Sequence, residues 1–323
     1  MSTVQDYLEK RRPTLDLAFN KELSVLLGGI AAKDLASLIT GIEAGKKIRG
    51  CLCCMINDAL GGDPESAIPR AVAVELIQAA TLIHDDFVDQ DAFRRNRPAV
   101  WTLEGARRAV LIGDVIFASA IRGMNDLSRE DGVTVSHAIA QVSKGALYEP
   151  VDPKVMAAEI EAGRESGQTY EKIIHLKTGI LFGAACRLGS IAAGANGNLR
   201  ERAYRYGLRI GEAYQIADDL KEVKQHMLLR FIHPGQMVAL APAFLHFAGK
   251  RRSQILTLLK GESTTLDDLA LEFFSAAASL MEDEIERRLQ SAVSEIGEHF
   301  PDNEYSELVR KAPWDIIRMF NES

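Results

Sequence analysis

Apolar residues recur along this chain at the spacing of α-helices rather than at the alternation of β-strands. Residues 71–83 read AVAVELIQAATLI, which is apolar nearly all round and predicts a helix buried among others. Similar stretches cover residues 109–121, 178–193 and 206–219, and residues 266–296 show a long amphipathic spacing with Glu and Arg on the outer face. No alternating stretch of useful length predicts a strand.

Clusters of Pro and Gly at residues 61–64, 150–153 and 233–235 predict loops between these helices. The chain has 323 residues, which is typical of one large domain or two small ones. It shows no internal repeat and no low-complexity linker. We therefore expect a single all-α domain over residues 1–323, built as a large helix bundle.

The composition of the chain excludes some classes of binding partner. The chain carries 38 Lys and Arg against 45 Asp and Glu, a net charge of −7, which argues against nucleic acid or an anionic membrane as the main partner. No signal peptide opens the chain, and no run of about 18 uncharged apolar residues predicts a transmembrane segment. Its four cysteines are expected to be buried thiols in a reducing compartment. These features predict a cytoplasmic protein.

The first segment that indicates chemistry is HDDFVD at residues 84–89. Asp85 and Asp89 are four residues apart, so both carboxylates lie on one face of a helix, about 6 Å apart along its axis. Such carboxylates repel each other, and oxygen ligands of this kind suit Mg²⁺. Three acids in this pattern arise by chance roughly once in a chain of this composition, so alone the segment fits a solvated helix end equally well.

The arrangement recurs at residues 218–222, DDLKE, again at the end of an apolar helix. Asp218 and Glu222 repeat the four-residue spacing. Two acidic helix ends can hold several Mg²⁺ ions between them, and such sites bind polyvalent anions, above all diphosphates.

Basic residues accompany the acidic segments. Lys46 and Arg49 precede the first acidic segment, Arg94 and Arg95 follow it, and Lys177 precedes the second. Ammonium and guanidinium groups bind phosphate oxygens without a metal. The ordering of acids and bases therefore predicts a protein that holds two phosphorylated substrates in two different ways.

Taken in order, these segments resemble a known family. GKKIRG at residues 45–50, LIHDDFVD with a following RR at 82–95, KTG at 177–179, and YQIADD with a following Glu at 214–222 are similar to the ordered signature of the trans-isoprenyl diphosphate synthases, the polyprenyl synthetase family. The resemblance implies an all-α fold around a central apolar cavity, and a homodimer.

The resemblance also implies a metal site. Three Mg²⁺ ions per active site would be bound by carboxylates from both acidic segments, with Asp85 and Asp89 as the main ligands in the first. The implied ligands are Asp85, Asp86, Asp89, Asp218, Asp219 and Glu222.

Substrate contacts follow in the same way. The resemblance assigns Arg94 and Lys177 to the allylic diphosphate, and assigns Lys46, Arg49 and Arg95 to a metal-free pocket for isopentenyl diphosphate. Gln78, two turns before Asp85 on the same face, belongs to the substrate-binding set. Thr178 and Gln215 are placed near the reacting carbons, where their dipoles stabilise an allylic cation. The catalytic set is Lys177, Thr178, Gln215 and Arg94.

The implied reaction is the head-to-tail, trans condensation of the two diphosphates. The allylic carbon–oxygen bond ionises, the double bond of isopentenyl diphosphate attacks the cation, and a proton is lost. Ala80 and Thr81 are small where short-chain relatives carry a bulky aromatic residue, so we expect a product of twenty carbons or longer. Replacing Ala80 by Phe is expected to shorten it.

Two departures leave alternatives open. Glu222 stands where most relatives have Asp, and a Gly-Lys-x-x-x-Asp-like loop after the second acidic segment is not recognisable at residues 223–237, where Lys224 or Arg230 are the candidate substitutes. A terpene cyclase on the same scaffold is favoured by the altered loop and disfavoured by the retained basic residues. A non-catalytic subunit of a heteromeric synthase is disfavoured by the intact first segment.

Overall fold

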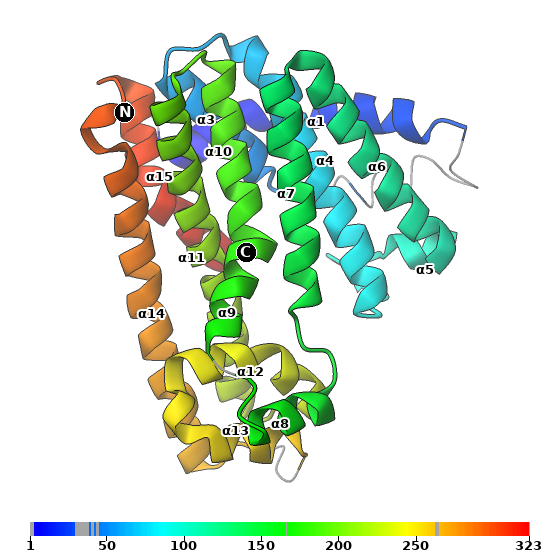
Figure 1. Ribbon diagram of the computed structural model, residues 1–323, viewed down its shortest axis with the longest axis vertical. Helices are drawn as coiled ribbons and strands as arrows, with labels where there is room; N and C mark the ends of the chain where they lie inside the picture. The colour runs from blue at the N-terminus through cyan, green and yellow to red at the C-terminus, as the bar shows by residue number, and fades with distance from the viewer. Residues whose placement is uncertain are drawn as a thin grey trace. The chain divides into compact units, whose positions relative to one another are not determined.

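Helices make up nearly all of the regular structure. The structure is a computed structural model that describes residues 3–29, 39, 42, 45–165, 167–261 and 265–322 (Figure 1). Its α-helices are α1 (Val4–Leu27), α3 (Ile48–Ala59), α4 (Pro64–Val88), α5 (Val100–Glu104), α6 (Ala106–Leu127), α7 (Arg129–Leu147), α8 (Pro153–Glu161), α9 (Gln168–Ile173), α10 (Ile180–Ala192), α11 (Gly197–Leu229), α12 (Pro234–Ala248), α13 (Arg252–Leu259), α14 (Asp268–Ile296) and α15 (Glu304–Asn321).

Five short elements complete the regular structure of the described residues. A π-helical segment, η1 (Ile174–Gly179), joins α9 to α10, and the 3₁₀ turns η2 (Gly249–Arg251) and η3 (Gly297–His299) follow α12 and α14. The two-residue strands β1 (Phe93–Arg94) and β2 (Arg97–Pro98) pair antiparallel. The prediction of an all-α fold is confirmed.

Three helices begin where the sequence predicted loops. Pro64, Pro153 and Pro234 are each the first residue of a helix, where the missing N–H is no loss and the fixed φ suits the helix. The residue before each proline caps the helix. Asp152 Oδ1, for example, accepts from the backbone N–H of Lys154 at 2.8 Å.

By its contacts the chain divides into two compact units, each assembled from three segments. The first unit comprises Met1–Ala140, Leu181–Gly207 and Glu295–Ile316, and the second comprises Gln141–Ile180, Leu208–Ser294 and Ile317–Ser323. The boundaries fall inside α7, α10, α11, α14 and α15. The single domain expected over residues 1–323 remains a prediction.

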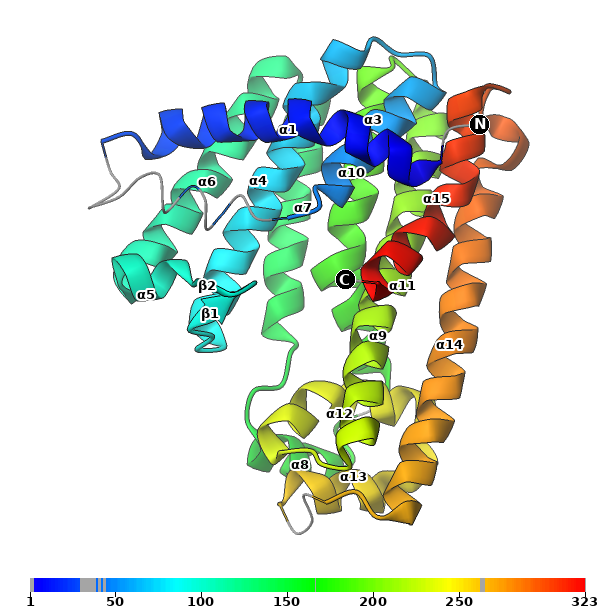
Figure 2. The ribbon, with the colours of Figure 1, turned by 180° about the vertical axis from the view of Figure 1, so that it is seen from behind.

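The core of the first unit is formed around α3, α4 and α10. Helix α1 crosses α3, α4 and α6 (Figure 2). Cys51, Cys53, Cys54 and Cys186 are all buried and free, as expected. Gly189 allows α10 to approach α3 closely, because a Cβ there would collide with the backbone carbonyl of Cys53.

Helix α4 is the single described helix that is long and apolar enough to cross a membrane by length and composition. Of its most apolar window, 61% is buried inside the protein, and the core helix of a folded protein passes the same test.

In the second unit, α8, α12 and α13 pack together beside α9 (Figure 1). Phe244 of α12 lies against Phe273 and Phe274 of α14, with ring centroids 4.8 and 4.5 Å away. These aromatic contacts fix the end of α14 that begins at Asp268, while the rest of α14 carries the polar residues described below.

Candidate active site

The first acidic segment lies at the C-terminal end of α4, in the first unit. Asp85 is half-buried and Asp89, the C-cap residue, is exposed, and the helical geometry places them on one face. Gln78, two turns earlier on this face, is half-buried. Asp86 is turned about 100° away from Asp85 and is only 3% exposed.

A tight hairpin brings Arg94 back onto Asp86. The central residues of the hairpin, Arg95 and Asn96, have φ of 51° and 61°, as a type I′ turn requires at both positions. Arg94 Nε donates to Asp86 Oδ1 in a short ion pair. Burial raises the pKa of Asp86, although Arg94 opposes this effect. Asp86, Arg94 and Arg95 line one small pocket between the hairpin and α4.

The basic residues before α3 gather near the same hairpin. A Cβ on Gly45 would lie 3.1 Å from Arg95 Nη1, so the Arg95 guanidinium approaches the backbone next to Lys46. Lys46 is exposed, and Arg49, in the first turn of α3, lies 4.4 Å from the centre of the Phe182 ring. Three of the predicted phosphate-binding residues thus lie around the N-terminus of α3, whose N–H groups favour an anion.

The second acidic segment lies on α11, in the second unit. Asp218 and Glu222 are exposed and share one face of the helix. Desolvation and the charge of Asp218 raise the pKa of Glu222, while the charge of Lys177 lowers it. Burial raises the pKa of Asp219 to about 7, although hydrogen bonds from Tyr170 and Gln215 pull it down.

A chain of hydrogen bonds joins three of the predicted residues in the second unit. The Thr178 hydroxyl donates to Gln215 Oε1 at 2.7 Å, and Gln215 Nε2 donates to Asp219 Oδ1 at 3.0 Å. Tyr170 OH donates to the other oxygen, Asp219 Oδ2, at 2.6 Å. Thr178 is 6% exposed. The π-helical segment is thereby attached to α11 at the second acidic segment.

Lys177, the neighbour of Thr178, forms an ion pair. Its Nζ lies 2.7 and 2.6 Å from the two carboxylate oxygens of Glu149, just beyond the end of α7. The side chains of Lys177 and Glu149 are 25% and 34% exposed, so solvent and ligands reach the pair.

The grouping of the acidic side chains decides whether they fit Mg²⁺. Among the residues that the structure describes, no three acidic, histidine or cysteine side chains converge on one point. Each acidic segment instead presents one pair of carboxylates on a helix face, and in the second pair the charge of Asp218 adds to the desolvation that raises the pKa of Glu222. Mg²⁺ is usually held by one or two carboxylates together with substrate phosphates, so the donor set fits this ion when a diphosphate completes the coordination.

Sequence reasoning missed two of the partners. Glu149 lies just before the loop predicted at residues 150–153, and nothing in its spacing links it to Lys177. Tyr170 lies 49 positions from Asp219, and no local signal points to their contact. The structure describes the residues of the first acidic segment and those of the second within separate units.

A family model described as polyprenyl synthetase matches residues 34–227. The chain belongs to the polyprenyl synthetase family. The matched range contains both acidic segments and all of the site residues that the sequence predicted. The polyprenyl synthetase resemblance inferred from the ordered motifs is therefore confirmed.

Relatives of this polyprenyl synthetase chain include proteins of known name. The short chain isoprenyl diphosphate synthase of Methanothermobacter thermautotrophicus is 34% identical over 231 residues, covering 69% of this chain and 67% of that protein. The (2E,6E)-farnesyl diphosphate synthase of Mycobacterium tuberculosis is 34% identical over 178 residues, covering 55% and 49%. The match thus spans about half the length of the farnesyl synthase. Membership of the family supports trans-prenyl transfer.

The fold agrees with this membership. A polyprenyl synthase from Caulobacter crescentus, solved in complex with calcium and isoprenyl diphosphate, is similar over 97% of both chains with a TM-score of 0.76 and 23% identity. At that identity the likeness shows a shared all-α fold.

Proposed function

We propose that this chain is a magnesium-dependent trans-prenyltransferase that condenses an allylic diphosphate with isopentenyl diphosphate, head to tail, to a product of twenty carbons or longer. Matched relatives are named farnesyl, geranylgeranyl and geranylfarnesyl diphosphate synthases. The observation that carries the proposal is the hydrogen-bonded chain from Thr178 through Gln215 to Asp219, which links two residues expected near the reacting carbons to an acidic segment.

The chemistry assigned to Thr178 and Gln215 is the stabilisation of positive charge. Because the Thr178 hydroxyl donates to Gln215, its own oxygen lone pairs remain available to face an allylic cation. Gln215 is oriented by its bond to Asp219, so its dipole needs little reorganisation during the reaction. The burial of Thr178 keeps water, which would capture the cation, away from this point.

The basic residues bind the two diphosphates. Lys177 and Arg94 hold the allylic diphosphate by exchanging their carboxylate partners for phosphate oxygens. Lys46, Arg49 and Arg95 hold isopentenyl diphosphate beside the N-terminus of α3. Gln78 contributes to substrate binding from the face of Asp85.

Magnesium, three ions per site, would be held by the carboxylates of both acidic segments, which are Asp85, Asp86, Asp89, Asp218, Asp219 and Glu222. When bound, it neutralises the departing diphosphate as a Lewis acid. Asp86 is bonded to Arg94, and Asp219 to Tyr170 and Gln215, so these two also orient neighbouring groups. Asp85, Asp89, Asp218 and Glu222 are then the main ligands.

The region after the second acidic segment differs from the family loop. Helix α11 continues through it to Leu229, Lys224 Nζ lies 2.6 Å from Glu282, and Arg230 Nη2 lies 2.6 Å from Asp268. Both ion pairs are exposed, and such pairs contribute only about 0–1 kcal/mol, so a phosphate oxygen can displace the carboxylate. We propose that Lys224 or Arg230 supplies the missing cation.

We also propose that the protein acts as a cytoplasmic homodimer. The four buried, free cysteines agree with a reducing compartment. The homodimer is proposed by analogy with the family.

The test is incubation of the pure protein with Mg²⁺, farnesyl diphosphate and labelled isopentenyl diphosphate. We expect label in a prenyl diphosphate of at least twenty carbons, and none after chelation of the metal. An Asp85→Ala chain serves as the matched control for non-enzymatic breakdown.

The alternatives give different outcomes in the same assay. A terpene cyclase would consume farnesyl diphosphate and release diphosphate, but no product would contain label from isopentenyl diphosphate. A non-catalytic subunit would consume neither substrate. Either result overturns the proposed function.

A further inference from the structure

The segment that carries Lys177 and Thr178 has an unusual backbone. Residues 174–179 form a π-helix, a rare conformation that occurs mostly as single turns and frequently at functional sites. Side-chain contacts of this segment hold it against α11: His175 meets Glu212, and Thr178 meets Gln215.

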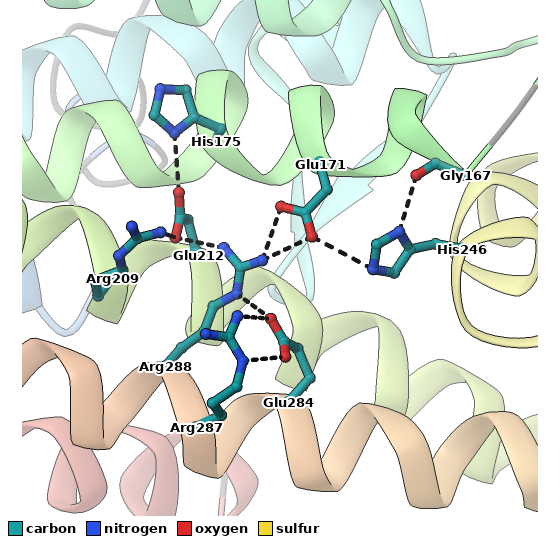
Figure 3. A network of polar contacts seen from close by, with 9 residues as sticks. All are labelled: Gly167, Glu171, His175, Arg209, Glu212, His246, Glu284, Arg287 and Arg288. Atoms are coloured by element: carbon teal, nitrogen blue, oxygen red, sulfur yellow. Dashed lines mark hydrogen bonds and ion pairs between the residues drawn. The ribbon is translucent and has the colours of Figure 1, made fainter.

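The carboxylates next to this segment are bound by one buried arginine, Arg288 of α14 (Figure 3). Its side chain is 3% exposed, and its guanidinium reaches carboxylates on three helices. Nη2 lies 2.8 and 2.7 Å from the oxygens of Glu171 on α9, Nη1 forms a short ion pair with Glu212 on α11, and Nε lies 2.7 Å from Glu284 on α14 itself.

Glu212 also contacts the π-helical segment. His175 Nδ1, within the segment, lies 2.9 Å from Glu212 Oε1, while Arg209 Nη1 lies 2.9 Å from Glu212 Oε2 (Figure 3). A Cβ on Gly179, the last residue of the segment, would lie 3.0 Å from Glu212 Cγ, so the segment also packs directly on this side chain.

Arg288 therefore contacts both α9, which precedes the reactive residues, and α11, which packs against them. Glu171 lies just before the π-helical segment, and Glu212 holds the segment itself through His175. Glu212 also precedes Gln215 by three residues on α11, so the same helix turn that contacts Arg288 leads to the partner of Thr178.

We propose that Arg288 is a positioning residue for prenyl transfer, which holds the π-helical segment in register with α11 so that Thr178 meets Gln215 and Lys177 faces the diphosphate. This inference rests on the proposed function, because it explains the placement of two residues assigned to that reaction. Arg288 itself contacts neither substrate nor the acidic segments in the interactions described.

The neighbouring arginine provides a matched control. Arg287 is on the same helix and also pairs with Glu284, but its side chain is 63% exposed and it contacts neither Glu171 nor Glu212 in the interactions described. A variant of Arg287 removes one guanidinium from α14 and leaves the link to the π-helical segment intact.

The experiment compares Arg288→Met, Arg288→Lys and Arg287→Met with the wild-type chain. We expect Arg288→Met to lower kcat about 100-fold, since a misplacement of about 1 Å costs that much, and to leave KM for isopentenyl diphosphate unchanged. Arg288→Lys should recover part of kcat, because one ammonium keeps the charge but loses the bidentate contact with Glu171. Arg287→Met should match the wild type.

Loss of Arg288 leaves the buried Glu212 carboxylate with only His175 and Arg209 as partners, so a double variant separates folding from positioning. In Arg288→Met with Glu212→Gln this carboxylate is replaced by a neutral amide, and the thermal midpoint should lie closer to that of the wild type than in Arg288→Met, while kcat stays low. Amide hydrogen exchange at residues 174–179 should be faster than in the wild type in both this chain and Arg288→Met.

Three results would overturn the proposal. The first two are wild-type kcat in Arg288→Met, and recovery of both stability and kcat in the double variant, which would make the role of Arg288 purely structural. An equal loss in Arg287→Met would overturn it too. A wild-type chain without prenyl transfer refutes the proposed function instead, and the hydrogen exchange of the segment still tests the link to Arg288.

Discussion

Replacing Glu212 by Gln tests how far the fold depends on one ionised carboxylate. Glu212 is 2% exposed and is hydrogen-bonded by His175, Arg209 and Arg288. Burial alone would raise its pKa, but the hydrogen bond from His175 and the charges of Arg288 and Arg209 together lower the pKa from an ordinary 4.5 to about 2.

The sign of the effect follows from linkage. Because the pKa is lower in the folded chain than in the unfolded one, ionised Glu212 stabilises the fold fully above about pH 4.5, and this contribution is lost as the pH falls toward 2. The interval between 4.5 and 2, at about 1.4 kcal/mol for each pKa unit, corresponds to about 3 kcal/mol. Breaking a buried ion pair by removing one partner typically costs about 3–5 kcal/mol, which agrees.

The assay is urea unfolding of the wild type and of Glu212→Gln, followed by far-ultraviolet circular dichroism from about pH 7 down to about pH 3. We expect the variant to have a free energy of unfolding about 3 kcal/mol lower at neutral pH, and this difference to shrink as the pH falls below about 4.5. Glu201→Gln is the matched control on α11. Its side chain is 47% exposed and pairs with Arg187 and Arg205, so it should change stability by less than about 1 kcal/mol.

Parallel stability curves would refute the reasoning. If the difference between the wild type and Glu212→Gln is the same at about pH 7 and about pH 3, the stabilisation does not depend on the charge of Glu212. An equal loss in Glu201→Gln would show a general sensitivity of α11.

Three further substitutions test the site. Asp85→Ala should abolish turnover at saturating Mg²⁺ while leaving the thermal midpoint intact, because removing one carboxylate relieves its repulsion with Asp89; full activity would contradict the metal assignment. Lys46→Ala and Arg49→Ala should each raise KM for isopentenyl diphosphate about tenfold or more and leave KM for the allylic substrate unchanged, measured by initial rates; the opposite split would mean that the two pockets are reversed.

The helical fold could be predicted because local sequence patterns in this chain indicate which helices are buried and where some of them begin. The apolar stretch at residues 71–83 lies within α4, and its residues Ala71–Ile77 are buried. The three proline clusters mark the starts of α4, α8 and α12 as well, since a proline at the first position of a helix loses no backbone hydrogen bond. Both signals depend on neighbours in sequence.

Residue pairs within one helix were also predictable, whereas their tertiary partners were not. The spacing of Asp85 and Asp89 is a property of the helix. The contact between Arg94 and Asp86 depends instead on a two-residue hairpin with Arg95 in the left-handed region, which few non-glycine residues adopt. The spacing of apolar and polar residues does not predict such a turn.

One missed residue did leave a signal. Glu212 is the single acid among residues 206–217, where Arg209 is the other charged residue and most of the rest are apolar. A buried carboxylate costs several kcal/mol unless it is paired, so an acid there predicts a cationic partner from elsewhere in the chain. The identity of that partner, Arg288, 76 positions away, could come only from the structure.

The two small residues considered for product length lie on different faces of α4. Thr81 is turned about 40° from Asp85 around the helix axis, whereas Ala80 is turned about 140° away. Ala80 is fully buried, and Thr81 is half-buried with its hydroxyl 2.8 Å from the Gln78 carbonyl oxygen. The sequence expectation singled out Ala80 for the shortening substitution, but Thr81 is the residue on the face of Asp85, so we expect a chain growing from the metal site to run beside Thr81.

We therefore expect Thr81→Phe to shorten the product by one or more five-carbon units, as measured by chromatography of the dephosphorylated products. Ala80→Phe should mainly lower the thermal midpoint, because a large side chain at a fully buried position costs about 1–3 kcal/mol or more. The reverse pattern, a shorter product from Ala80→Phe and an unchanged one from an active Thr81→Phe chain, would place the growing prenyl chain on the opposite side of α4. The helix face, rather than the distance in sequence from Asp85, then decides which small residue sets the product length.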